Sequence, residues 1–277
     1  MPRIASIHVY PLKSARGIDL TEAAVEPWGL AGDRRWMLVD PEGRFVSQRS
    51  EPSLGRIDVH LDAAGGGLVV GTEGRPSLHV PVPDDNRLTA VQVWRSEVKA
   101  ALAGAEADAW FSAFLGRPVQ LVHLDDPTRR LVDPAYGRPG DRVSFADGYP
   151  LLATAAGSLE ALRSWIDERH GPIPMNRFRP NVVVEGIEPW AEDRWRRIRI
   201  GQVDFRAAKP SGRCLVTTTD QRTGERGSEP LKALGRHRRF GTKLVFGMNL
   251  IPDAPGTIRL GDEVTVLEWS ARRVAQR

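Results

Sequence analysis

The sequence predicts a mainly β protein with a few helices, an α+β chain arranged as two domains. Short apolar runs bounded by Gly, Pro, Asp and Asn recur along the chain, which is typical of β-strands joined by tight turns. Two segments instead show the spacing of three and four residues that marks one face of a helix. The length of 277 residues exceeds the usual size of one domain, about 100–200 residues, so we expect two domains.

The first expected domain, residues 1–124, begins with strands. Ile4–Tyr10, Trp36–Asp40 and Phe45–Ser47 are apolar runs of strand length. Asp40-Pro41-Glu42-Gly43 is expected to be the turn between the last two, because Pro presets φ at the first central position and Gly tolerates a positive φ. These strands predict a β-rich N-terminal domain.

Each domain is expected to contain one amphipathic helix. The first has Ala107, Trp110, Phe111, Phe114 and Leu115 on one face and ends at Gly116 and Pro118. We interpret its aromatic residues as core rather than as part of a cofactor site. The second, Leu159–Arg169, has Ser158 as a possible N-cap and Gly171-Pro172 as its stop, and it buries Leu159, Leu162, Trp165 and Ile166.

The second expected domain covers residues 125–277. Residues 125–142 are rich in Pro, Asp, Arg and Gly without periodicity, which predicts an inter-domain connection or a long surface loop. A hairpin turn is expected at Asp220–Gly224. Five strands, enough to close or nearly close a small barrel, are expected at Val182–Glu185, Ile198–Ile200, Val203–Ala207, Cys214–Thr219 and Val264–Leu267.

Composition narrows the function classes. Hydrophobic residues form 41% and charged residues 27% of the chain, which is typical of a folded globular protein. The single cysteine argues against disulfides and against an iron–sulfur cluster held by this chain. The 39 basic residues are interleaved with 35 acidic ones, which favours a small phosphorylated ligand over nucleic acid. The charged start, Met1–Leu12, and the lack of a long apolar run predict a cytoplasmic protein without a membrane span.

Cys214 is the main candidate for chemistry. It follows a turn at the mouth of an expected strand, with Lys209 and Arg213 close by in the sequence. Cationic surroundings favour the thiolate, which is both a nucleophile and a soft metal ligand. A lone cysteine is more often a small buried hydrophobe, so the pattern alone leaves a reactive and a structural cysteine both open.

Two basic segments lie at the ends of expected strands. Pro11-Leu12-Lys13-Ser14 follows the first strand, and Asn176–Asn181 precedes Val182–Glu185. Arginine, lysine and hydroxyl groups in such loops suit a phosphate, although solvated basic residues are the alternative for either segment viewed alone. The sequence shows no His-x-x-x-His pair, dinucleotide fingerprint or P-loop, which argues against zinc and against those modes of nucleotide binding.

These motifs together resemble a known family. Tyr10-Pro11-Leu12-Lys13-Ser14 followed by Gly32-Asp33-Arg34-Arg35-Trp36 is similar to the β-barrel domain that precedes MOSC domains. The resemblance is nearest to the amidoxime-reducing components of mitochondria and their bacterial counterparts, and it runs from Ile4 to Leu267. The segments that resemble the MOSC domain, also a β-barrel, are Phe178–Asn181, Arg213–Asp220, Phe246–Asn249 and Pro255–Asp262.

The resemblance implies a molybdenum cofactor of the molybdopterin form. Cys214 would be the catalytic residue and the protein ligand to molybdenum. Asn249 stands where some relatives carry an aromatic residue, so substrate contacts would differ. The implied cofactor-binding residues are Lys13, Ser14 and Arg34 from the N-terminal domain and Thr154, Arg179, Asn181, Ser211 and Arg213 from the MOSC domain.

The implied activity is reduction of N-hydroxylated or N-oxygenated compounds such as hydroxylamines and amidoximes. Because the sequence shows no cluster cysteines and no flavin or nicotinamide motif, electrons would come from a separate donor protein, of flavin, iron–sulfur or haem type. The alternative is a sulfur carrier or cofactor-maturation protein that holds a persulfide on Cys214. Cofactor sulfurases share the paired domains but add a pyridoxal-phosphate domain that this sequence does not show, which favours the reductase. Asp220 could affect proton delivery, but we favour a role in the hairpin turn.

Overall fold

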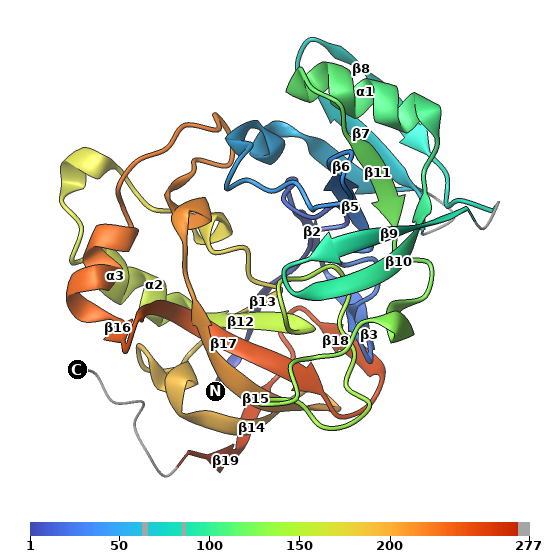
Figure 1. The fold of residues 1–277 in the computed structure, drawn as a ribbon. Coiled ribbons are helices and arrows are strands. Elements are labelled where there is room, and N and C mark those ends of the chain that lie inside the picture. The colour runs from blue at the N-terminus through green and yellow to red at the C-terminus, as the bar shows by residue number, and fades with distance from the viewer. Residues whose placement is uncertain (63–65, 85–86, 271–277) are drawn as a thin grey trace.

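The computed structural model describes residues 1–62, 66–84 and 87–270 and confirms the mainly β prediction. Figure 1 shows an upper β-rich part with helix α1 (Ala105–Leu115) at its outer edge, and a lower part built around the largest sheet. Helices α2 (Ala156–Arg163) and α3 (Leu231–His237) lie together at one side of the lower part. No helix in these residues is long and apolar enough to span a membrane.

The largest sheet joins the two ends of the chain. All its neighbouring strands are antiparallel except β12 (Leu151–Ala155) and β13 (Val182–Glu185), which are parallel and connected by α2. A small strand, β16 (Arg239–Phe240), pairs with β17 (Lys243–Pro252) outside the main path. In spatial order the sheet contains β19 (Val264–Trp269), β14 (Trp195–Ile200), β15 (Val203–Gly212), β17 (Lys243–Pro252), β12 (Leu151–Ala155), β13 (Val182–Glu185), β1 (Arg3–Val9) and β2 (Ile18–Leu20).

The part of the chain that the structure describes also forms three smaller sheets. The four-stranded sheet contains β5 (Trp36–Val39), β11 (Gln120–His123), β10 (Ser96–Leu102) and β9 (Leu88–Val93). One three-stranded sheet contains β6 (Asp58–Leu61), β7 (Leu68–Thr72) and β8 (Arg75–Val80). The other contains β18 (Gly256–Arg259), β3 (Glu22–Glu26) and β4 (Gly29–Leu30). The described residues also contain six short 3-10 helices: η1 (Pro52–Arg56), η2 (Pro127–Arg129), η3 (Glu168–His170), η4 (Met175–Arg177), η5 (Ala191–Arg194) and η6 (Leu215–Thr218).

Strand pairing crosses the expected domain boundary. β1 pairs with β13, and β3 pairs with β18, so strands from the start of the chain complete sheets of its second half. The segment 125–142 contains η2 and one isolated bridge, Leu131 to Arg142, and no longer element. The division into residues 1–124 and 125–277 therefore stays a prediction from the sequence. In the structure, strands from both halves belong to the same sheets.

The elements that the pattern placed well are those with strong local signals. β13 matches the expected Val182–Glu185, and its valines are buried between neighbours, which suits β-branched side chains. α1 buries Ala107 and Phe111 and ends at Gly116, whose positive φ of 69° closes the helix. The Asp40–Gly43 turn is confirmed, because the Gly43 N–H donates to the Asp40 carbonyl with φ 78° at Gly43.

The strand predicted at Cys214–Thr219 was wrong. Cys214 caps the 3-10 helix η6 instead. The Thr217 hydroxyl donates to the Cys214 carbonyl at 2.9 Å, and the Thr218 hydroxyl donates to the Leu215 carbonyl at 2.8 Å. The β-branched residues suggested a strand, but the threonine hydroxyl groups instead bond to carbonyl groups three residues earlier. These bonds stabilise a turn of helix in place of an extended strand.

Three further expectations need correction. Phe45–Ser47 forms no strand, only an isolated bridge from Phe45 to Val39. The expected helix Leu159–Arg169 begins earlier and ends earlier, as α2, because Ser158 is not its cap: the Ser158 hydroxyl donates to buried Glu192 at 2.9 Å. The five-strand list also omitted β12 and β17, whose nearly uniform burial hides the alternation that marks a strand.

Candidate functional site

A cavity of about 1150 Å³ is lined by residues from both parts of the molecule. Nine lysine or arginine residues line it, against two aspartates. Of the predicted site residues, the cavity brings together Lys13, Ser14, Arg34, Arg179, Asn181, Ser211, Arg213 and Cys214. The electrostatic character of the cavity therefore favours an anionic ligand.

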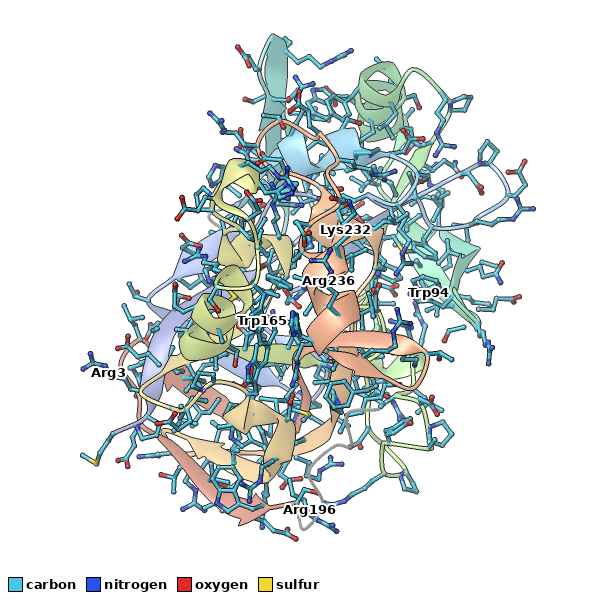
Figure 2. The ribbon with its side chains drawn as sticks, turned by 90° about the vertical axis from the view of Figure 1, so that its left-hand side faces the viewer. Arg3, Trp94, Trp165, Arg196, Lys232 and Arg236 are labelled. Atoms are coloured by element: carbon cyan, nitrogen blue, oxygen red, sulfur yellow. The ribbon has the colours of Figure 1, made fainter. Side chains whose placement is uncertain are left out.

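Cys214 is half-buried and contacts an arginine from the first part of the chain. Arg49 Nε donates to Cys214 Sγ at 3.3 Å, and the Arg49 guanidinium lies 4.1 Å from the centre of the Trp94 ring. Trp94 is 41% exposed, and Figure 2 shows it on the side of the molecule opposite Arg3. The thiol is therefore accessible from the cavity and has a cation against it.

Lys13 and Asp147 form an ion pair on the cavity wall. Lys13 Nζ donates to Asp147 Oδ1 at 2.6 Å and to the Phe145 carbonyl at 2.8 Å. Burial lowers the pKa of Lys13 to about 8, although Asp147 opposes that shift. Burial would raise the pKa of Asp147, but Lys13 and then Arg49 outweigh it and hold that pKa far below its usual range. Lys13 is therefore charged at neutral pH, although its pKa of about 8 lies only a little above that pH.

Tyr10 lies between two predicted site arginines. The Arg34 and Arg179 guanidinium carbons each lie 4.2 Å from its ring centre. Arg34 is anchored by buried Asp33, at 2.6 and 2.8 Å, and by Asn181 Oδ1 at 3.0 Å. Burial raises the pKa of Tyr10 to about 12 and lowers that of Arg179 to about 10, so the ring stays neutral and Arg179 stays charged. The two cations can remain this close because the aromatic faces and the carboxylate offset their repulsion.

Backbone strain gathers at the cavity. Among the described residues, five that are not glycine have a positive φ, and four of these line the cavity: Ser14 (72°), Arg34 (48°), Trp94 (57°) and Arg179 (55°). A left-handed conformation costs an ordinary residue about 1–2 kcal/mol. Such strain persists where the surrounding structure holds it, commonly at ligand sites.

Arg213 reaches back across the turn before Cys214. Its Nη1 donates to Ser211 Oγ at 2.9 Å, and its Nη2 donates to the Phe178 carbonyl. Burial lowers the pKa of Arg213 to about 10, which leaves it charged at neutral pH. Arg213 Nε and the Tyr149 hydroxyl are buried at the cavity without a hydrogen-bond partner in the described part of the protein. Both have hydrogen-bonding capacity left for a ligand.

Two residues considered from the sequence lie elsewhere. Thr154 is fully buried in β12, and its hydroxyl donates to Met175 Sδ at 3.4 Å, so it does not line the cavity. Asp220 does start the predicted turn: its Oδ1 accepts the N–H groups of Arg222 and Thr223, at 2.9 and 3.0 Å. Its other oxygen accepts from Arg177, and Asp220 is not part of the cavity wall.

Sequence reasoning missed several cavity residues. Arg49, Trp94 and Asp147 form a contact network with Lys13 and Cys214. Only Trp94 offered a local signal, as an aromatic residue followed by Arg95, and the structure places both in the turn between β9 and β10. Arg49 and Cys214 are 165 positions apart, so no local pattern could join them.

Comparison with known families matches both halves of the chain. Residues 1–118 match the MOSC N-terminal beta barrel domain, and residues 140–265 match the MOSC domain. A further match is mitochondrial amidoxime-reducing component 1 of Mus musculus, 32% identical over 95% of this chain and 82% of the relative. The chain belongs to the MOSC-domain family.

This MOSC protein has further relatives of two kinds. Mitochondrial amidoxime-reducing component 1 of Homo sapiens is 30% identical, again over 95% of this chain and 82% of the relative. Molybdenum cofactor sulfurase of Homo sapiens is 28% identical over 90% of this chain. The chain spans only 30% of the sulfurase's length, so most of that relative has no counterpart in the match.

Proposed function

We propose that this MOSC protein binds a molybdenum cofactor of the molybdopterin form and reduces N-hydroxylated compounds such as amidoximes and hydroxylamines. The observation that carries the proposal is the position of Cys214, the only cysteine, in a basic cavity that both parts of the chain line. The similarity to proteins named amidoxime-reducing components supports the choice of reaction.

The donor set of the cavity fits such a cofactor. A thiolate is a soft ligand suited to a metal that is also held by dithiolene sulfurs. The excess of lysine and arginine suits a phosphate. Arg213 Nε and the Tyr149 hydroxyl have no hydrogen-bond partner among the described residues and remain available for polar ligand atoms. The volume of about 1150 Å³ is slightly above the usual range of ligand pockets, about 300–1,000 Å³, so the cavity can hold a cofactor and a small substrate.

The predicted residues would divide the binding between them. Arg179 and Arg213 supply charged donors from the second half of the chain, and Lys13 supplies one from the first half. Asn181 acts through a neighbour, because its Oδ1 already accepts from Arg34 and from the Leu152 N–H, and its amide nitrogen donates to the His8 carbonyl. Asn181 therefore orients Arg34 toward the ligand.

The reaction joins one N-hydroxy compound, two electrons and two protons to give the N–H compound and water. When bound, the cofactor would supply the two-electron redox centre, with the Cys214 thiolate as its protein ligand. Lys13 holds a proton at Nζ at neutral pH, and its pKa of about 8 is low enough for that proton to be given up. The Asp147 carboxylate keeps Lys13 charged between turnovers.

The electrons require a source outside this chain. We propose a separate electron-donor protein with a flavin, iron–sulfur or haem centre, because the sequence offers no motif for any of these groups.

Metal analysis and a reductase assay test the proposal together. Purified protein from a cofactor-competent host should contain about one molybdenum per chain and, when reduced by dithionite, should convert benzamidoxime to benzamidine. Cys214→Ala should lose this activity and retain the fold, as judged by circular dichroism. Leu215→Ala is the matched control, because Leu215 is the next residue, is 54% exposed and lies outside the cavity wall. Full activity in Cys214→Ala would refute the assignment.

The similarity to cofactor sulfurase over 90% of the chain supports a second candidate, a sulfur carrier that uses Cys214. A carrier would hold a persulfide on Cys214, detectable by mass spectrometry, and would leave benzamidoxime unreduced. The dithionite assay therefore separates the two functions.

A further inference from the structure

An unbroken series of aromatic rings runs from the α2–α3 surface to the cavity. His237 stacks on Trp165 at 4.3 Å between ring centres, and Trp165 stacks on Trp190 at 5.3 Å. The series continues from Trp190 to Phe246 at 5.9 Å and from Phe246 to Phe178 at 3.9 Å. Phe178 lines the cavity and lies 5.5 Å from the Arg213 guanidinium, next to Cys214 in the chain.

The outer end of this series is partly open to solvent. His237 is exposed and Trp165 is half-buried, whereas Phe178 and Phe246 are fully buried. Electron tunnelling weakens steeply across gaps between atoms, so rings in contact shorten the gaps that an electron must cross. The series therefore forms a continuous aromatic connection between this surface and Phe178 on the cavity wall.

A basic surface surrounds that outer end. Residues 231–243 contain no aspartate or glutamate, and Lys232, Arg236 and Arg239 are exposed. We call these three residues the α3 basic face. None of them pairs with a carboxylate in the described residues, whereas Arg238 in the same segment is buried and pairs with Asp193. Figure 2 shows Lys232 and Arg236 beside Trp165 on one face of the molecule.

The α3 basic face also continues toward the cavity. Lys243 is exposed, belongs to the hairpin that pairs Phe240 with Lys243, and lines the cavity. Lys209 also lines the cavity, and the charge of Lys243 contributes, after burial, to a lowered pKa of Lys209. A partner of negative charge would thus be attracted to the surface where the aromatic series begins.

We infer that the α3 basic face is the docking surface for an acidic electron-carrier protein. The inference rests on the proposed reductase function, since only that function needs such a carrier. Each carrier molecule loses one electron at this surface, so two must dock in turn for each N–O bond that is broken. The substrate takes up these two electrons with two protons, and the oxygen leaves as water.

The test compares charge reversal on this face with the same reversal elsewhere. The double variant Lys232→Glu/Arg236→Glu changes the surface, and Arg3→Glu/Arg196→Glu is the control with an equal change in net charge. Arg3 and Arg196 are exposed and lie at the edges of the view in Figure 2, away from α3. The probe is an acidic plant-type [2Fe–2S] ferredoxin, and the measurements are its affinity at low and high ionic strength and its oxidation rate in the presence of benzamidoxime.

We expect the wild type and the control to bind the ferredoxin in a salt-sensitive way. The α3 double variant should bind it about tenfold or more weakly at low salt, with a matching loss in ferredoxin-driven turnover. Dithionite-driven turnover should stay unchanged in all three proteins, because the substituted residues lie outside the cavity wall. If the wild type does not reduce benzamidoxime with dithionite, the proposed function is refuted. Normal dithionite activity with equal ferredoxin affinity in both variants, or with no ferredoxin binding by the wild type, would overturn the docking surface alone.

Discussion

Replacement of Gly247 by alanine should destabilise this MOSC protein more than replacement of any open glycine of similar backbone conformation. Gly247 lies in β17 with φ 81°, within the motif Phe246–Asn249. A Cβ at this position would lie 2.7 Å from the Ala153 carbonyl oxygen and 2.8 Å from Thr154 Cγ2. Neither neighbour can move easily, because β12 is hydrogen-bonded on both sides, to β13 and β17.

The expected magnitude has two parts. The left-handed backbone costs alanine about 1–2 kcal/mol, and steric overlap in a packed interior adds about 1–3 kcal/mol. Gly261→Ala is the matched control, because Gly261 has φ 85° and an added Cβ there would meet no atom of the described residues within 4 Å. The difference between the two variants therefore isolates the overlap with β12.

Urea unfolding followed by circular dichroism measures this difference. With an m-value of about 3 kcal/mol per M, an extra cost of about 2 kcal/mol lowers the midpoint by about 0.7 M relative to the control. Equal midpoints for Gly247→Ala and Gly261→Ala would show that β12 yields to the new methyl group, and the steric reasoning would be wrong.

Two other predictions concern buried polar groups. Burial raises the pKa of Glu192 to about 7, above its ordinary value of about 4.3. The folded state therefore favours the protonated carboxyl, and the stability that this group contributes is complete below about pH 4 and is lost as the pH rises through 7. Glu192→Gln should flatten this dependence, which amounts to roughly 3 kcal/mol between pH 4 and 8; an unchanged slope in thermal or urea unfolding would contradict the assignment. Thr154→Val should leave the molybdenum content unchanged and stability within about 1 kcal/mol, because it removes only a weak hydrogen bond to Met175. Loss of molybdenum in that variant would show that Thr154 does reach the proposed cofactor.

Local patterns were reliable where the physical signal was local. The 3-4 spacing of α1 and its glycine stop depend on neighbours within a few residues, and both were placed correctly. The same reasoning failed at Cys214–Thr219, because threonine suits a strand by its branching and a turn by its hydroxyl. β12 and β17 were missed because strands covered on both faces lose their alternation.

The sequence by itself determined the family, the β-rich class and most of the candidate site. Short motifs contain five of the cavity residues, and each motif is recognisable without knowledge of its tertiary contacts. These residues are Lys13, Arg34, Arg179, Arg213 and Cys214.

The tertiary structure alone decided which groups those residues contact. Arg49 reaches Cys214, and Asp147 reaches Lys13, across 165 and 134 positions of chain. It also decided that Thr154 is packed against Gly247 instead of facing the cavity. Such contacts depend on how strands from distant parts of the sequence pair and pack. The packing energy comes from many residues far apart in the chain, so no local pattern predicts the contacts.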